Sequence, residues 1–172
     1  MNLQSNDFEL FGIPARQQQD RAVLDQRWKE LQREVHPDRF AAHGSAAQRV
    51  AMQWSVRVNE AYQRLKDPLH RAAYLCEMHG VPVQAESNTA MPPEFLMQQM
   101  AWREALEEAE RPDALEALLD EVAAAKRAWL EDCQRQLDEA QNYAAAVRCV
   151  RALMFIERFG RDIEARLDQL GQ

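Results

Sequence analysis

Cysteine is scarce in this chain, and its spacing excludes the usual cysteine-based sites. The three cysteines, Cys76, Cys133 and Cys149, are odd in number and far apart, and no Cys-x-x-Cys pair occurs. A structural zinc site or a disulfide framework would need paired cysteines at short spacings. The cysteine content therefore indicates a reducing compartment, and we expect a cytoplasmic protein.

Long apolar runs are also missing. No stretch approaches the roughly 20 apolar residues that a membrane-spanning helix needs. Residues 1–5 do not form the basic segment followed by an apolar one that begins a signal peptide. We therefore expect neither a membrane span nor a membrane partner.

The motifs of common enzyme classes are missing as well. The sequence has no Gly-rich phosphate loop, no Gly-x-Ser-x-Gly elbow and no His-x-x-x-His pair among its four histidines. We therefore expect no enzymatic activity, no metal and no cofactor. One alternative stays open, a carboxylate-metal oxidoreductase in the C-terminal half, because acidic residues cluster at 104–110. That cluster has no histidine at helical spacing, which carboxylate-bridged metal bundles usually contain.

The net negative charge of the chain comes from its C-terminal half. The net charge is −7: residues 1–90 carry 11 acidic and 11 basic side chains, whereas residues 91–172 carry 17 acidic and 10 basic ones. The acidic half would repel a phosphate backbone, so we expect no nucleic-acid partner.

Two amphipathic patterns flank the tripeptide His36-Pro37-Asp38. Apolar residues recur at helical spacing before it (Leu24, Trp28, Leu31 and Val35) and after it (Val50, Trp54, Val58, Ala61 and Leu65). Pro37 disfavours helical geometry at His36, so the first helix should end there. The pattern predicts a helical hairpin with an imidazole and a carboxylate at its exposed tip.

The segments around this tripeptide resemble the J-domain, the module that stimulates ATP hydrolysis by DnaK-type chaperones. They are residues 7–13 before the tripeptide, and 59–62 and 71–74 after it, so the resemblance covers about residues 5 to 75. It implies that the chaperone is contacted by the tripeptide and by basic residues of the preceding helix. The residues concerned are His36, Pro37, Asp38, Arg27, Lys29 and Arg33.

The same basic residues also have a simpler interpretation, a solvated helix face. Asp25 and Glu30 interrupt the basic face. Because J-domains are often basic there, the interruption favours a dedicated chaperone over a general one.

Three further helical patterns follow Pro92-Pro93, at about 94–110, 113–139 and from Asn142 to the end. Short connections between long helices imply antiparallel neighbours. We therefore expect an all-α protein with an N-terminal J-domain helical hairpin at 1–80, a linker at 81–91 and a C-terminal three-helix bundle at 92–172.

The first of these patterns has two apolar faces. At about 100° per residue, Phe95 and Trp102 share one arc, whereas Leu96, Met97 and Met100 lie on the opposite side. A bundle helix needs only one buried face, so the second apolar face predicts a surface for a protein partner. The alternative is that it packs against the linker or the first domain.

Acidic residues continue the second face, and one aromatic residue on the last helix lies near its own apolar stripe. The acidic residues are Glu104, Glu107 and Glu108, and the aromatic residue is Phe155. Phe155 is either a core residue at the edge of the bundle or an extension of the partner surface.

With the J-domain, the segment Phe95-Leu96-Met97 and its Glu-rich continuation resemble the HscB family, the J-domain co-chaperones of bacterial iron–sulfur cluster assembly. The resemblance spans nearly the whole chain. It implies ATPase stimulation of a dedicated chaperone, HscA, and delivery of the scaffold protein IscU, in the maturation of iron–sulfur proteins. The scaffold contacts that it implies are Leu96, Met97, Met100, Glu104, Glu108 and Phe155. A J-domain protein with a different client remains the other alternative.

Overall fold

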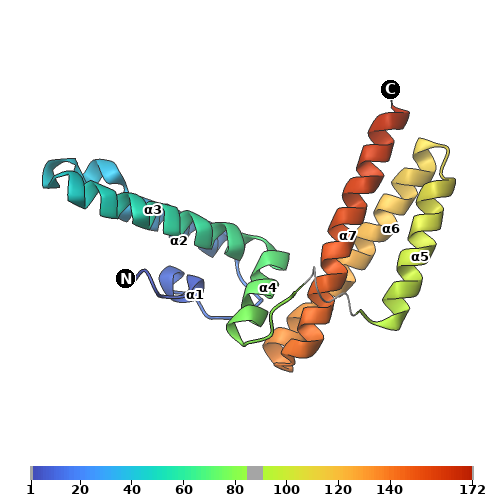
Figure 1. Ribbon diagram of the computed structural model, residues 1–172, viewed down its shortest axis with the longest axis horizontal. Coiled ribbons are helices and arrows are strands. Elements are labelled where there is room, and N and C mark those ends of the chain that lie inside the picture. Colours follow the sequence, from blue (N-terminus) through green and yellow to red (C-terminus); the bar gives the residue numbers. More distant parts are fainter. Residues whose placement is uncertain (1, 85–90, 172) are drawn as a thin grey trace. The chain divides into compact units, whose positions relative to one another are not determined.

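The computed structural model describes residues 2–84 and 91–171, and within those ranges every regular element is helical (Figure 1). The elements are α1 (Asp7–Phe11), α2 (Arg21–Val35), the 3₁₀ segment η1 (Pro37–His43), α3 (Ser45–Lys66), α4 (Pro68–Met78), α5 (Pro93–Glu108), α6 (Pro112–Gln134), the π-helical turn η2 (Arg135–Glu139) and α7 (Tyr143–Leu170). The chain divides into two compact units, residues 1–75 and 76–172. None of the described helices combines the length and low charge that a bilayer crossing needs.

Side-chain caps set the ends of the first helices. Asn6 and Glu9 form a reciprocal capping box at the start of α1, and Gly12, at φ +64°, ends that helix in the left-handed region that favours glycine. Asp20 caps α2, as its position predicts, by accepting from the Ala22 N–H at 2.9 Å. Ser45 is the first residue of α3, and its hydroxyl does not cap the helix.

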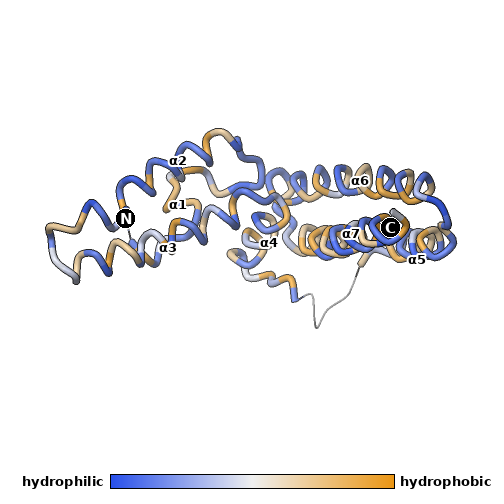
Figure 2. The backbone as a smooth tube through the Cα atoms, turned by 90° about the horizontal axis from the view of Figure 1, so that it is seen from above, coloured by the Kyte–Doolittle hydropathy of each residue, from blue (hydrophilic) through white to orange (hydrophobic). Residues whose placement is uncertain are grey.

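The predicted hairpin is formed by α2 and α3, whose hydrophobic residues recur along each tube in Figure 2. Residues from both apolar stripes are buried together: Leu24, Leu31, Val35, Val58, Ala61 and Leu65. Val50 is an exception, since it is 51% exposed on α3. Trp28 lies at the edge of this core, where it stacks on Tyr62 at 4.9 Å and donates to Asn59 Oδ1 at 2.9 Å.

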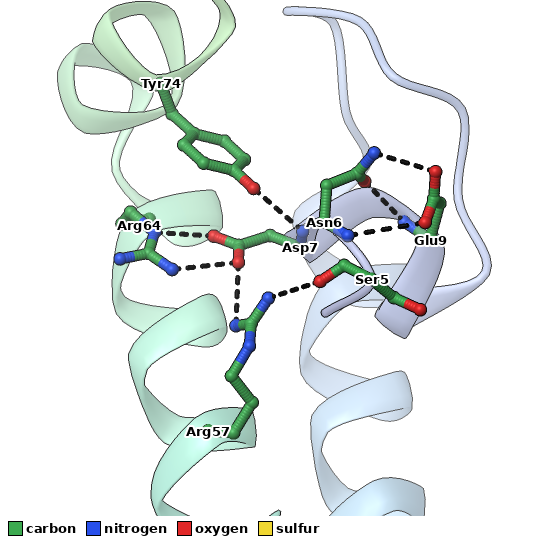
Figure 3. A network of polar contacts seen from close by, with 7 residues as sticks. All are labelled: Ser5, Asn6, Asp7, Glu9, Arg57, Arg64 and Tyr74. Atoms are coloured by element: carbon green, nitrogen blue, oxygen red, sulfur yellow. Dashed lines mark hydrogen bonds and ion pairs between the residues drawn. The ribbon is translucent and has the colours of Figure 1, made fainter. Parts of the chain in front are cut away.

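A buried carboxylate joins α1 to α3 (Figure 3). Asp7 is fully buried, and its two oxygens pair with Arg57 Nη1 at 2.8 Å and Arg64 Nε at 2.6 Å. The Asp7 backbone N–H donates to the Tyr74 hydroxyl at 3.0 Å. A buried charge is tolerated when it is paired in this way. Asp7 therefore fixes α1 on the hairpin.

In the second unit, α5, α6 and α7 surround one hydrophobic core, as expected of a three-helix bundle (Figure 1). Phe95 and Trp102 contribute from α5, and the largest α7 residues are Phe155, Ile156 and Phe159. Aromatic rings dominate this core: the Phe95 ring meets those of Trp102, Trp129 and Phe155 edge-on at 5.3 to 6.2 Å. These packed rings give α5 a fixed orientation about its own axis.

The segment after α4 is anchored within the second unit. The His79 ring stacks on Tyr143 at 4.0 Å, and the carbonyl of the buried Val83 accepts from Arg151 Nε at 2.9 Å. The predicted linker, 81–91, therefore begins in ordered contacts with α7. Its residues 85–90 lie outside the described residues.

Candidate functional site

The hairpin tip is built around a sharp change of backbone at His36. Its φ of −60° and ψ of 129° end α2 and begin η1, in which Pro37 takes the first position. The Asp38 N–H donates to His36 Nδ1 at 3.2 Å. The two side chains stay 55% and 92% exposed, so the tip presents both to a partner.

The hydrogen bond at Nδ1 decides which nitrogen of the neutral imidazole carries the proton. An Nδ1 atom that accepts an N–H is unprotonated, so the proton lies on Nε2. The Asp38 carboxylate lies 3.6 Å from the same Nδ1 and would form an ion pair only with a protonated ring. The neutral tip therefore offers one N–H donor and one carboxylate acceptor, side by side.

Arg39 is a tip residue that the sequence analysis missed. Its Nη1 donates to the Arg33 carbonyl at 3.1 Å, and its backbone N–H donates to the His36 carbonyl at 3.0 Å. Gln32, Arg33, His36 and Arg39 line one surface hollow. The position of Arg39 directly after the tripeptide could have indicated its role from the sequence. Its contacts show that Arg39 ties the tip to the last turn of α2.

The three predicted basic residues do not share one environment. Lys29 and Arg33 are exposed and four residues apart, so they lie on one side of α2. In the described ranges, no carboxylate lies within 4.0 Å of either of them. Arg27 instead donates to the Phe11 carbonyl at 2.8 Å and pairs with Glu30 at 2.7 Å. The structure therefore gathers Lys29 and Arg33 near the tip and ties Arg27 to α1.

The two carboxylates that interrupt the basic face are engaged within the hairpin. Asp25 accepts from the Tyr62 hydroxyl at 2.6 Å and pairs with Arg21 at 2.9 Å. The Tyr62 hydroxyl, and then the Arg21 guanidinium, hold the pKa of Asp25 below its ordinary value. Hydrogen bonds from Gln26, and then Arg27, likewise lower the pKa of Glu30. Arg21 and Arg27 therefore form the ion pairs of these two carboxylates, and in the described ranges Lys29 and Arg33 have no ion pair within 4.0 Å.

The predicted partner surface on α5 is exposed. Leu96, Met97 and Met100 are 47%, 73% and 67% exposed, respectively. Glu104 and Glu108 are also exposed, one and two turns further along the helix. Trp102, on the opposite arc, is 2% exposed, so the division of α5 into two faces is as the spacing predicts. We call Leu96, Met97 and Met100 the α5 patch.

Phe155 lies at the edge of the core and is only 7% exposed. Its ring stacks on Phe159 at 5.7 Å, and the Arg103 guanidinium lies over it at 5.4 Å. Phe155 and Leu96 line the same groove between α5 and α7. The contact of Phe155 with a partner stays a prediction. The structure places Phe155 in the lining of the groove that Leu96 of the α5 patch also lines.

The acidic residues that the structure describes in the second unit do not form a metal-binding cluster. Among the described residues, no group of three or more His, Cys, Asp or Glu side chains is arranged to hold a metal ion. The glutamates of α5 instead occupy an exposed helix face.

Known proteins similar to this chain match over nearly its full length. Residues 91–164 match the family model of the HSCB C-terminal oligomerisation domain. The co-chaperone protein HscB homolog of Burkholderia multivorans is 50% identical over 173 residues, covering 99% of this chain and 98% of that protein. The homolog of Bordetella petrii is 52% identical over 159 residues, covering 92% and 94%.

The chain belongs to the HscB co-chaperone family.

Two solved HscB structures resemble the structure of this chain. Chaperone HscB from Vibrio cholerae has a TM-score of 0.81 at 37% identity and covers 96% of this chain and 99% of its own. Human co-chaperone HscB has a TM-score of 0.89 at 25% identity, with coverage of 96% and 84%. The prediction of an all-α HscB fold is confirmed.

Membership of the HscB family settles the broad class of function. HscB proteins are co-chaperones, so the prediction that this chain is not an enzyme is confirmed. A co-chaperone acts on a chaperone, here one of the Hsp70 (DnaK) type.

Proposed function

We propose that this chain stimulates the ATPase of a dedicated DnaK-type chaperone, HscA, and delivers the iron–sulfur scaffold IscU to it. The observation that supports this proposal is the presence of two exposed surfaces of opposite charge, one on each compact unit. His36, Asp38, Lys29 and Arg33 form the first, on residues 1–75. The α5 patch with its glutamates forms the second, on residues 76–172.

Each surface suits a different partner. Lys29 and Arg33, with no ion-pair partner in the described ranges, favour approach to an acidic chaperone surface. The α5 patch offers flexible apolar side chains with carboxylates nearby, which suits an apolar partner surface flanked by basic groups. Because one chain carries both surfaces, the bound scaffold is held close to the chaperone, and its effective concentration rises.

The proposed location is the cytoplasm. Cys76, Cys133 and Cys149 are all free and buried, a state that a reducing compartment maintains.

A three-component ATPase assay tests the proposal. The purified full chain should raise the ATPase rate of HscA, and adding IscU with the chain should raise it further than the two added separately would predict. Calorimetry should show direct binding of IscU to the chain. A chain that stimulates HscA without binding IscU would indicate a J-domain protein with a different client, and a chain that does neither would overturn the proposal.

A further inference from the structure

Two apolar side chains of α3 are exposed to solvent one helical turn apart. Met52 and Val56 are 54% and 50% exposed, respectively. At about 100° per residue, Val56 lies nearly opposite the buried Val58 and Leu65, on the outward face of the helix. Packing of the hairpin core therefore does not explain why these two positions are apolar. We call Met52 and Val56 the α3 patch.

A glutamine side chain of α2 contacts α3 directly beside the α3 patch. The Gln32 side-chain oxygen accepts from the Ser55 hydroxyl at 3.1 Å, and its Nε2 donates to Asn59 Oδ1 at 2.6 Å. Ser55 follows Met52 by three residues. Asn59 follows Val56 by three residues, so each contact has one residue of the α3 patch as its neighbour on the helix surface.

The same glutamine lies among the α2 residues that we assign to chaperone contact. Gln32 lines one surface hollow with Arg33 and His36, and it follows Lys29 by three residues. Helices α2 and α3 run side by side (Figure 2). The basic residues of α2 and the α3 patch are therefore two parts of one surface of the hairpin, which meet at Gln32.

Charge and apolar area make different contributions to such a surface. Attraction by Lys29 and Arg33 acts at a distance and is screened by salt. Burial of apolar area acts only after the two proteins touch and does not depend on that attraction, so it mainly slows dissociation. A basic surface alone accepts many acidic partners, whereas an adjacent apolar patch also requires a matching apolar area on the partner.

We propose that the α3 patch extends the chaperone-binding surface of the hairpin and packs against an apolar area that lies beside acidic groups on the DnaK-type chaperone. This inference rests on the proposed function, since the tip and the basic residues of α2 bring the same partner to the hairpin. The continuity of the α3 patch with that surface selects the chaperone as its occupant. The α3 patch contributes affinity, whereas the tip stimulates ATP hydrolysis.

Replacing the two apolar side chains by glutamine tests the proposal, because glutamine is a good helix former and leaves the net charge unchanged. The double variant Met52→Gln, Val56→Gln should need about tenfold more protein for half-maximal stimulation of HscA, a loss typical of interface anchors. Its maximal rate should stay near that of the parent, because the tip is intact. The tenfold difference should persist at raised salt, which weakens parent and variant alike.

Val50→Gln is the matched control, because Val50 is 51% exposed on the same helix. Nine residues separate Val50 from Asn59, so the two lie about 180° apart around α3. Val50→Gln should leave the half-maximal concentration unchanged, whereas Val56→Gln alone should raise it about threefold. Thermal unfolding should show a parental melting curve for each variant, as expected for exposed positions.

A folded double variant with the parental half-maximal concentration would overturn this inference, and so would an equal effect of Val50→Gln. Calorimetry with IscU and sedimentation of the chain test two other occupants. Loss of IscU binding by the double variant would assign the α3 patch to the scaffold, and a parental dimer that the double variant converts to a monomer would assign it to a second copy of the chain. Either result would overturn the inference, whereas parental behaviour in both would support it.

Failure of this inference can be distinguished from failure of the proposed function. In each of the overturning results the parent chain would still stimulate HscA. A parent chain that does not stimulate HscA would overturn the proposed function and this inference together.

Discussion

His36 uses its two ring nitrogens for different purposes. Nδ1 accepts the Asp38 N–H and holds the turn, whereas Nε2–H is left for a partner. A glutamine side chain cannot accept the Asp38 N–H and present an N–H donor with the same geometry. His36→Gln should therefore abolish most of the ATPase stimulation. The residue is exposed, so the free energy of unfolding should change by less than about 0.5 kcal/mol. Single-turnover ATPase assays and thermal melts measure the two effects.

His43→Gln is the matched control for this change. His43 is an exposed histidine of the same 3₁₀ segment and is not part of the tripeptide. It should keep near-parental stimulation. Full stimulation by a normally folded His36→Gln variant would contradict the role of the tip.

The Tyr62 hydroxyl tunes the pKa of Asp25 on the basic face of α2. Tyr62 is the first cause of its lowered pKa, so Tyr62→Phe should raise the Asp25 pKa toward its ordinary value near 3.9. A lowered folded pKa stabilises the fold above the unfolded pKa, and that stabilisation is lost as pH falls through the folded value. Tyr62→Phe should therefore reduce the acid sensitivity of the hairpin. Carboxyl NMR titration measures the shift, and an unchanged Asp25 pKa would exclude the Tyr62 hydroxyl as its cause.

At the scale of the element, α2 carries the charge that we assign to chaperone contact. Changing both Lys29 and Arg33 to Glu should weaken stimulation of HscA, and raised salt should mimic the effect in the parent by screening. Binding of IscU should be unchanged, because these residues lie on the other compact unit. ATPase titrations and calorimetry provide the two readings.

The control changes Arg127 and Arg161 to Glu. These are two exposed arginines of α6 and α7, so the net charge changes by the same amount at another place on the chain. This control should leave HscA stimulation intact. If the Lys29 and Arg33 variant lost both activities equally, the two surfaces would not be separable.

The two faces of α5 predict opposite consequences of truncation. Changing Leu96, Met97 and Met100 to Ala should cost little stability, since these side chains are exposed and no core cavity opens. Trp102→Ala on the buried arc should cost roughly 3–5 kcal/mol. Thermal or urea unfolding of each variant measures the difference.

The affinity for IscU should follow the reverse order. Loss of three interface anchors at about 1–2 kcal/mol each corresponds to at least about a hundredfold weaker binding by the triple variant. Its stimulation of HscA without scaffold should survive. A triple variant that melts far below the parent would assign this face to a buried contact, and one that is stable and binds normally would exclude it as the scaffold surface.

At the scale of the whole molecule, the three thiols report on the integrity of the second unit, because Cys76, Cys133 and Cys149 all lie within residues 76–172. Burial raises the pKa of Cys76 to about 11 and that of Cys149 to about 12, and it raises the pKa of Cys133 as well. Thiolates are the reactive species, so the folded chain should resist alkylation at neutral pH.

Alkylation should therefore proceed at the rate at which the unit opens. All three thiols should gain reactivity together as urea is added, and Trp102→Ala should accelerate them all. Mass spectrometry of timed alkylation measures this. Rapid modification of one thiol in the native protein would show that the unit opens locally around it.

The helical hairpin, its break at His36 and the two faces of α5 were all predictable from the sequence. Each depends on interactions within a few residues: the periodicity of a helix places Trp102 opposite Leu96 and its neighbours, and the ring of Pro37 acts directly on His36. The exposed His36 and Asp38 and the α5 patch could be predicted without knowledge of distant contacts.

Contacts between residues far apart in the chain were decided only by the tertiary structure. The fully buried Asp7 meets Arg64, and Arg27 is drawn to Phe11 instead of joining Lys29 on the open face. Likewise, Phe155 is buried because α5 packs over it, and the groove with Arg103 exists only where α5 and α7 meet. Helical periodicity gives the direction in which a side chain leaves its own helix, but which atoms it meets depends on how separate helices pack.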